Sequence, residues 1–373
     1  MISSEPMRTS SPATGWSHAT ARLLFAPTLV LLLASFFPAL FWATAKRSTA
    51  QAPSGSAELA LRGARQAMEQ GDFAAAARGF EEVRREAPEV KETWGSLALC
   101  YLRLGEKARA LDVAREAAAR WPEDGETRHL LGFLYFQTGQ AEPAIRELSR
   151  AAKLLPNRHE PQMDLALAYL SVKQYGPAAD ALEAVIRLQP ELALPRILLG
   201  RAYQNSNRTL LGIREFQKAL AIDPKIPLGH YHLGYAYESL GRNAEAIVEF
   251  RKELAQHEGN SEVFYRLGRA LLDSGQAKEA LVELRRALRA EPNNADAQFA
   301  LGNALLDLEQ TQESIEALRR AAALNPEDPR PYFLLARAYG KLQKREEAAK
   351  ALQQFAELKK RQGVTGGMAY RPN

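Results

Sequence analysis

The residues that could carry chemistry in this chain are few and lie far apart. The six histidines are scattered, and His230 and His232 have a spacing that places them on different faces of a helix. The single cysteine, Cys100, excludes an intramolecular disulfide and a cysteine-rich zinc site, and we expect it to be a small buried side chain. No Walker loop, HExxH, GxSxG or CxxC motif occurs. The sequence therefore predicts no catalytic centre, no metal site and no cofactor.

The charge distribution limits the classes of partner. The formal net charge of the 373-residue chain is +5, and most of the excess of Lys and Arg lies in residues 1–56 and 363–373. Residues 57–362 carry almost equal numbers of basic and acidic side chains. A neutral body cannot supply the phosphate neutralisation on which nucleic-acid affinity depends, so we expect no DNA or RNA partner.

The function that remains is binding, and the residues that bind must be positioned by a repeated structural unit. From Ala57 to Gln362 the sequence repeats every 34 residues, nine times, without an insertion or deletion. When positions are counted within each repeat, position 8 is small in every copy, from Ala64 to Ala336, and so is position 20. Position 32 is Pro in seven copies. Such a constant register predicts one structural unit per repeat.

A single repeat, Gly125–Arg158, predicts a pair of helices. Apolar residues recur at helical spacing in its first half, and Gly139 at position 15 is suited to end a helix in the left-handed conformation. A second amphipathic stretch runs from Ala144 to Leu155, and Pro156 ends it. Because such a hairpin cannot bury its apolar face alone, consecutive hairpins must stack.

The second repeat has a distinctive set at positions 4, 7, 8 and 11, namely Trp94, Leu97, Ala98 and Tyr101. Together with Ala at position 20 and Pro at position 32, this pattern resembles the tetratricopeptide repeat family over residues 57–362. HEAT and armadillo units are longer, ankyrin units have a different signature, and the neutral charge argues against the RNA-reading pentatricopeptide arrays. The resemblance implies an all-α fold, a right-handed superhelical solenoid of antiparallel helix pairs.

The middle of the array departs from this pattern. Repeat five has Asn207 at position 15, where Gly is usual, and Gly212 at position 20, where Ala is usual. Repeat six has Glu253 at position 27 and lacks the proline. Either a local change in curvature or a loosened consensus accounts for these residues. The last expected helix, 345–361, is richly charged on its outer side, as an end cap must be.

The amino terminus predicts contact with a membrane. Residues 1–22 are polar and basic, and residues 23–45 carry no charge over a length that can cross a bilayer as a helix. The same stretch is also typical of a secretory signal, with Ala43 and Ala45 at the cleavage site. Anchor and cleaved signal both stay open. A buried soluble helix is disfavoured, because the stretch has no polar face to turn toward water.

The remaining ends are a linker and a tail. Residues 46–56 are small and polar and predict a flexible tether, and residues 363–373 predict a disordered tail. We expect the repeats to be exported or membrane-anchored, in the cell envelope or periplasm. The cytoplasmic face of the membrane is the alternative, because basic residues flank the apolar stretch almost equally on both sides.

A second stripe on the first helix of each repeat is the candidate binding surface. Positions 2, 5, 9 and 12 lie roughly 130° from the packing stripe at positions 4, 7, 8 and 11. The resemblance implies that this second stripe lines a concave groove, where helices or extended peptides dock. It is apolar in repeats two to five and aromatic in repeats six to nine, with interspersed Arg residues that are available to carboxylates. For any single residue, packing against the neighbouring repeat is the alternative. The candidate residues are Leu99, Leu102, Phe133, Phe136, Met163, Leu167, Arg201, Tyr231, Tyr235, Tyr265, Arg269, Phe299, Phe333 and Arg337.

These observations predict a protein that binds rather than catalyses. The leading hypothesis is a non-enzymatic scaffold of the cell envelope that binds other proteins in its groove and reaches the membrane through residues 23–45. The alternative is an accessory, polymer-binding subunit of an envelope glycosyl-transfer or polysaccharide system, since aromatic grooves also suit sugars. A cytoplasmic RNA binder is a third hypothesis, and it requires an affinity that falls steeply with salt.

Overall fold

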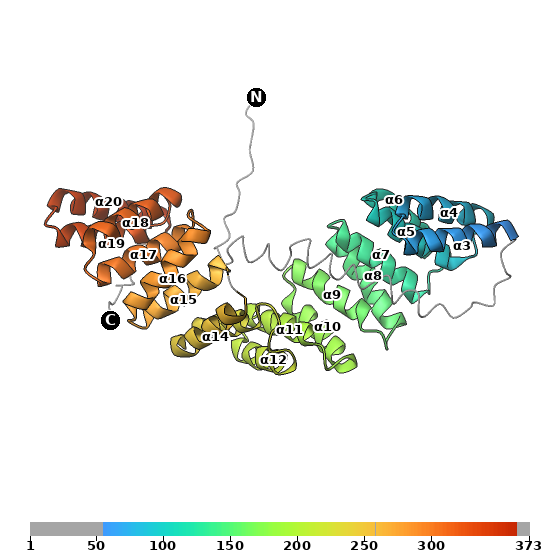
Figure 1. Cartoon of the computed structure of the whole chain (residues 1–373), viewed down its shortest axis with the longest axis horizontal. Helices are drawn as coiled ribbons and strands as arrows, with labels where there is room; N and C mark the ends of the chain where they lie inside the picture. Colours follow the sequence, from blue (N-terminus) through green and yellow to red (C-terminus); the bar gives the residue numbers. More distant parts are fainter. Residues whose placement is uncertain (1–54, 258, 364–373) are drawn as a thin grey trace, which may run out of the picture.

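A computed structural model describes residues 55–257 and 259–363, which form helices joined by short turns (Figure 1). Each repeat supplies two helices that pack antiparallel, and consecutive pairs stack into a curved rod. The described residues contain no strand, and the expected all-α solenoid of antiparallel helix pairs is confirmed. The helices are α3 (Gly55–Glu69), α4 (Phe73–Glu86), α5 (Lys91–Arg103), α6 (Lys107–Arg120), α7 (Gly125–Gln137), α8 (Ala141–Leu154), α9 (Glu160–Ser171), α10 (Tyr175–Leu188), α11 (Ala193–Asn205), α12 (Thr209–Ile222), α13 (Gly229–Ser239), α14 (Asn243–Gln256), α15 (Ser261–Asp273), α16 (Ala277–Ala290), α17 (Ala295–Asp307), α18 (Thr311–Leu324), α19 (Arg330–Lys341) and α20 (Arg345–Arg361).

Several predicted features fall outside the described residues. They are the basic segment 1–22, the apolar stretch 23–45 with Ala43 and Ala45, most of the linker 46–56 and nearly all of the tail 363–373. The linker is two residues shorter than predicted, because α3 already begins at Gly55. None of the helices from α3 to α20 has the length and apolar character needed to span a membrane.

The turn inside each repeat depends on one residue in the left-handed conformation. Position 15 has a φ between 57° and 79° in all nine repeats, which confirms the prediction made for Gly139. Five copies have Gly there, and the other four are Lys173, Asn207, Glu309 and Gln343. Crowding of the β-carbon makes this conformation cost about 1–2 kcal/mol for an ordinary L residue. The fold of the repeat therefore imposes strain on Lys173, Glu309 and Gln343, whereas Asn207 tolerates this conformation better.

The small residue at position 8 allows the two helices of a repeat to approach closely. A Cβ added to Gly132 would lie 2.6 Å from Cγ of Leu148, and one added to Gly200 would lie 2.5 Å from the ring of Phe216. Leu148 and Phe216 both occupy position 24 and are fully buried. The large side chain of the second helix thus fills the space that glycine leaves on the first.

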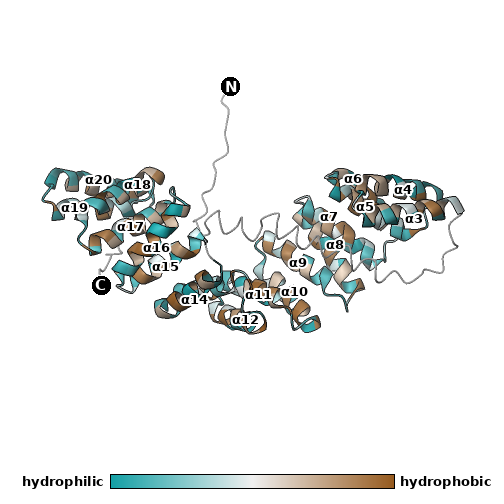
Figure 2. Ribbon diagram, viewed as in Figure 1, coloured by the Kyte–Doolittle hydropathy of each residue, from teal (hydrophilic) through white to brown (hydrophobic). Residues whose placement is uncertain are grey.

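The core runs continuously along the rod. Tyr135 packs against the buried clusters on either side of it, and Leu194 does the same in the middle of the array. Figure 2 shows hydrophobic residues where helices face each other and hydrophilic residues on much of the outer surface. Each hairpin therefore buries its apolar face against its neighbours, as a solenoid requires.

The residues that depart from the consensus have defined contacts. The carboxylate of Glu253 is 1% exposed and accepts hydrogen bonds from the backbone N–H groups of Leu228 and Tyr231, at 3.0 and 3.2 Å. It thereby caps α13, whose N-cap residue Leu228 is left-handed. A Cβ on Gly212 would lie 2.8 Å from the carbonyl oxygen of Gly200. Both residues therefore make specific contacts at the places where the sequence departs from the pattern.

Candidate functional site

The concave side of the rod is lined by the first helices of the repeats. These helices contact one another between successive repeats, as in α7 with α9, α11 with α13, and α15 with α17. In the middle of the rod, α12 lies on the outer side of the bend and α9 and α11 lie toward its inside (Figure 1). The inner wall that the sequence predicted is therefore formed by the expected helices.

A cavity of about 750 Å³ opens between α7, α9 and α11 and the turns that precede α9, α11 and α13; we call it the groove pocket. Phe133 and Met163, two predicted groove residues, contribute to it and are 4% and 8% exposed. Leu192 directly precedes α11, and Ile222 is the last residue of α12. Both lie at the edge of the groove pocket, where they are 36% and 39% exposed. A pocket with a covered apolar floor and exposed aliphatic edges suits an apolar side chain of a partner.

The polar rim of the groove pocket is mostly acidic. Arg158 is the arginine of this rim, and its guanidinium donates to Glu126 at 2.9 Å and to both oxygens of Glu160 at 3.0 Å. These hydrogen bonds join two successive repeats along the edge of the pocket. The Arg158 guanidinium holds the pKa of Glu160 below its usual value, against the opposing effect of burial.

Two further groups of the rim form a buried pair. Nε2 of His129 lies 2.7 Å from Oδ2 of Asp164, and the imidazole is almost completely covered. The pair links α7 to α9 across one side of the pocket. The pair thereby joins two successive repeats, with the imidazole covered and the Asp164 carboxylate still 13% exposed.

Sequence reasoning missed the residues at the end of each repeat. Leu192 and Ile226 stand at position 34, and Glu191 and Asp223 stand close before them. In other repeats position 34 is commonly Asp or Asn, which caps the next helix. An apolar residue at position 34, where a capping residue is usual, was the signal in the sequence that this end of the repeat lines the groove pocket.

The fourteen predicted groove residues divide by exposure. Six are buried within the chain, which favours the packing alternative for them: Leu99, Phe133, Met163, Arg201, Tyr231 and Tyr265. Seven are partly exposed: Leu102, Phe136, Leu167, Tyr235, Arg269, Phe299 and Phe333. Arg337 is exposed.

The prediction that the groove arginines are available to carboxylates of a partner is wrong for Arg201, which is buried, whereas Arg269 is partly exposed and is paired within the chain. Arg269 already donates to Glu238 of the neighbouring repeat at 2.7 Å. Arg201 is buried, and desolvation lowers the pKa of its guanidinium to about 10. Long side chains in this part of the groove bend back onto the protein, which sequence spacing does not reveal. Arg337 alone keeps the predicted exposure.

The aromatic stripe of repeats six and seven is also largely covered. Tyr231 stacks on Tyr235 with ring centroids 6.4 Å apart, and the guanidinium of Arg266 lies 4.6 Å from the centroid of Tyr235. Burial raises the pKa of Tyr231 and of Tyr265. Arg266 in turn donates a hydrogen bond to Glu262 at 2.8 Å, so the charged group of this cluster is paired within the chain. Little aromatic face is left for a sugar ring.

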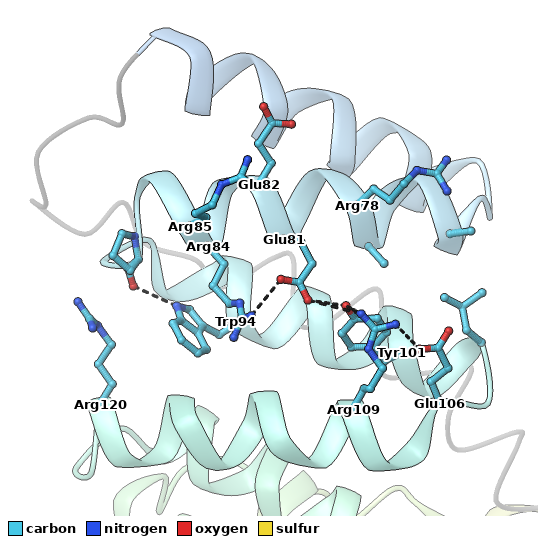
Figure 3. Close-up of a pocket in the computed structure, with 14 residues that line it drawn as sticks. Arg78, Glu81, Glu82, Arg84, Arg85, Trp94, Tyr101, Glu106, Arg109 and Arg120 are labelled. Atoms are coloured by element: carbon cyan, nitrogen blue, oxygen red, sulfur yellow. Dashed lines mark hydrogen bonds and ion pairs between the residues drawn. The ribbon is translucent and has the colours of Figure 1, made fainter.

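A second cavity, of about 760 Å³, lies on the outer side between α4 and α6, over α5. Figure 3 shows Glu81 directed at Tyr101 and Arg109, with Arg84 beside Trp94. Arg84 donates to Glu81 at 3.0 Å and its guanidinium lies 5.2 Å from the Trp94 ring centroid. The first contact lies within α4, and the second joins α4 to α5 of the next repeat. Within residues 55–257 and 259–363, no group of three or more His, Cys, Asp or Glu side chains could hold a metal ion.

The fold and the groove define a class of protein, an α-solenoid that presents a binding surface. A sequence model described as tetratricopeptide repeat matches residues 61–125, 197–261 and 265–329, and a second model of the same description matches residues 329–362. These matches cover more than half of the chain, so the chain belongs to the tetratricopeptide repeat family. This family is generally a non-catalytic module for protein–protein interaction, and the fold supports that role here.

Several solved structures are similar to this chain. The C-terminal part of a TPR repeat-containing protein from Cytophaga hutchinsonii is 16% identical, with a TM-score of 0.52 over 64% of this chain and 100% of that one. A tetratricopeptide repeat protein from Parabacteroides merdae is 16% identical, with a TM-score of 0.49 over 67% and 99%. YrrB, described as a TPR protein with an unusual peptide-binding site, is 25% identical, with a TM-score of 0.45 over 48% and 93%. No curated protein matches the chain.

Proposed function

We propose that the protein is a non-enzymatic scaffold of the cell envelope, which binds a helix or an extended segment of a partner protein in the groove pocket. The observation that carries the proposal is the exposed pair Leu192 and Ile222 beside the covered floor formed by Phe133 and Met163. Apolar side chains that stay exposed around a cavity favour a contact site, because they would otherwise be buried by the chain itself.

The proposed site occupies only part of the predicted groove. It extends over repeats three to five, where three first helices and the turns between repeats surround one cavity. Repeats six and seven act as a rigid continuation of the wall, because their charged and aromatic side chains pair with each other. A partner segment would therefore be anchored in the N-terminal half of the rod.

The envelope location rests on residues 23–45 and is independent of the groove. Their uncharged length supports either a membrane anchor or a cleaved export signal. N-terminal sequencing of the mature protein separates the two, since a chain that begins near residue 46 has lost the segment and a chain that keeps residues 23–45 has not. Recovery of the intact chain in the soluble cytoplasmic fraction would contradict both.

Polysaccharide binding is the weaker proposal. It requires exposed aromatic rings in the groove, and Tyr231 and Tyr265 are buried while Arg266 covers Tyr235. A glycan array with the full chain tests it directly, and binding there would move the proposal from proteins to sugars.

The groove is tested by changing its exposed edge instead of its floor. Replacing Leu192 and Ile222 with Asn removes apolar side chains that are 36% and 39% exposed at the edge of the groove pocket. The matched control replaces Leu210 and Val248, which are 63% and 49% exposed on the second helices α12 and α14. We expect the wild type and the control to cross-link the same envelope proteins, and the edge variant to lose them.

Two results would contradict the groove. One is full capture by the edge variant, and the other is equal loss in both variants. Circular dichroism of both variants must match the wild type, because the proposal requires that the fold survive. Phe133 is less suitable as a target, since replacing a buried aromatic side chain costs about 3–5 kcal/mol and would disturb folding.

A further inference from the structure

The rim of the groove pocket has a strong excess of negative charge. Its acidic side chains are Glu126, Glu160, Asp164, Glu191 and Asp223, and Arg158 is the arginine among the lining residues. The described array as a whole is almost neutral, so this excess is local. By contrast, the outer cavity is lined by more arginines than glutamates.

Part of this negative charge is paired with basic side chains of the protein itself. Arg158 is shared between Glu126 and Glu160, which together carry one more negative charge than it can neutralise. Asp164 is paired with His129. These three pairings fix the inner side of the rim.

The outer side of the rim is directed at solvent. Glu191 and Asp223 are both exposed, and they lie next to Leu192 and Ile222 in the sequence and in the pocket lining. One oxygen of Asp223 accepts a hydrogen bond from the backbone N–H of Lys225 at 3.0 Å, which orients the carboxylate while leaving its second oxygen open. Carboxylates therefore lie beside both of the exposed apolar residues.

We propose that the groove pocket selects a protein segment in which apolar residues are flanked by Lys or Arg. This inference rests on the proposed function and names the chemistry of its partner. The apolar residues would enter between Leu192 and Ile222, and the flanking cations would meet Glu191 and Asp223 at the rim. Cations at an acidic rim form charge-assisted hydrogen bonds, and the same carboxylates repel an acidic segment of equal apolar content.

The test selects random short peptides displayed on phage with the full-length protein as target. Phage that also bind the edge variant (Leu192→Asn with Ile222→Asn) are removed, so only peptides that depend on the pocket remain. We expect the remaining peptides to be enriched in Lys and Arg on both sides of apolar residues. A consensus peptide with Lys flanks should bind about tenfold more tightly than its Glu-flanked counterpart at low salt, and the difference should shrink as salt rises.

A charge variant isolates the rim. Glu191→Lys combined with Asp223→Asn makes the rim less negative and keeps a side-chain oxygen for the N–H of Lys225. It should lose about tenfold in affinity for the Lys-flanked peptide and gain affinity for the Glu-flanked one. The control makes the same change in charge far away on α20, with Glu346→Lys and Glu357→Gln, and should leave both affinities unchanged.

The outcomes separate the two proposals. If peptides depend on the pocket but show no preference for basic flanks, the charge inference fails and the groove remains. If no selected peptide depends on Leu192 and Ile222, both fail. The chain also holds one apolar stretch of its own with basic flanks, residues 23–45. A photo-crosslinker placed at position 192 that joins to that stretch within one chain would show an internal occupant and overturn the inference.

Discussion

The buried carboxylate of Glu253 gives the sharpest test of the structure, because the repeat consensus and the coordinates predict opposite results. Position 27 is Ala in the neighbouring repeats, at Ala219 and Ala287, so a consensus argument expects Glu253→Ala to stabilise the protein. In the structure the Glu253 side chain is 1% exposed and accepts hydrogen bonds from the N–H groups of Leu228 and Tyr231. Removing it leaves the first turn of α13 without its cap.

The magnitude follows from those two donors. A buried donor left without a partner costs about 1–3 kcal/mol, and loss of an N-cap costs about 1 kcal/mol. The removal of a buried charge and the better helix propensity of Ala offset part of this cost. We therefore expect Glu253→Ala to lower the free energy of unfolding of this region by about 2 kcal/mol, with Glu253→Gln intermediate because its amide oxygen still accepts.

Hydrogen exchange is the appropriate assay, because a repeat array opens locally and need not unfold in one step. A loss of about 2 kcal/mol corresponds to roughly 30-fold faster exchange of the amides of α13. The control is Glu245→Ala on α14, the helix that also carries Glu253. It removes an exposed carboxylate that is paired with Arg242 and should change the exchange of the α13 amides little. Unchanged or slower exchange in Glu253→Ala would refute the capping role and favour the consensus argument.

The remaining predictions concern buried and strained groups elsewhere in the rod. Burial raises the pKa of the Cys100 thiol to about 12, so native protein should react with maleimide only as fast as it opens, and rapid labelling at neutral pH would contradict the structure. Burial, reinforced by the charge of Arg201, lowers the pKa of His232 well below its usual value. The unfolded chain therefore takes up a proton as pH falls below about 6.5 while the folded chain does not, and stability falls by up to about 1.4 kcal/mol per pH unit in that window. His232→Phe, which keeps a ring on Phe216, should flatten this part of the pH profile of urea unfolding, and an equally steep profile would rule the cause out. Lys173→Gly relieves a residue held at a φ of 61° and should raise the free energy of unfolding, measured with urea, by about 0.5–1 kcal/mol, whereas the same change at an ordinary helical position should lower it.

The sequence by itself determined the repeating unit of this protein. The spacing of small and apolar residues specifies two helices and a turn, and these are local properties, because each depends on contacts within one hairpin. Gly139 illustrates this, since both its left-handed conformation and the turn that it forms were readable from position 15. The stacking of repeats followed from the need to bury the remaining apolar face.

Only the tertiary structure decided which part of the inner wall is open. Tyr231 and Leu192 both look like surface residues in the repeat pattern, yet the first is buried and the second is exposed at the pocket. Whether a side chain is covered depends on the rotation between neighbouring hairpins and on the direction of long side chains such as Arg266. The spacing of residues in a 34-residue repeat predicts neither of these. For the same reason, Glu191 and Asp223 line the rim of one pocket although they belong to different repeats.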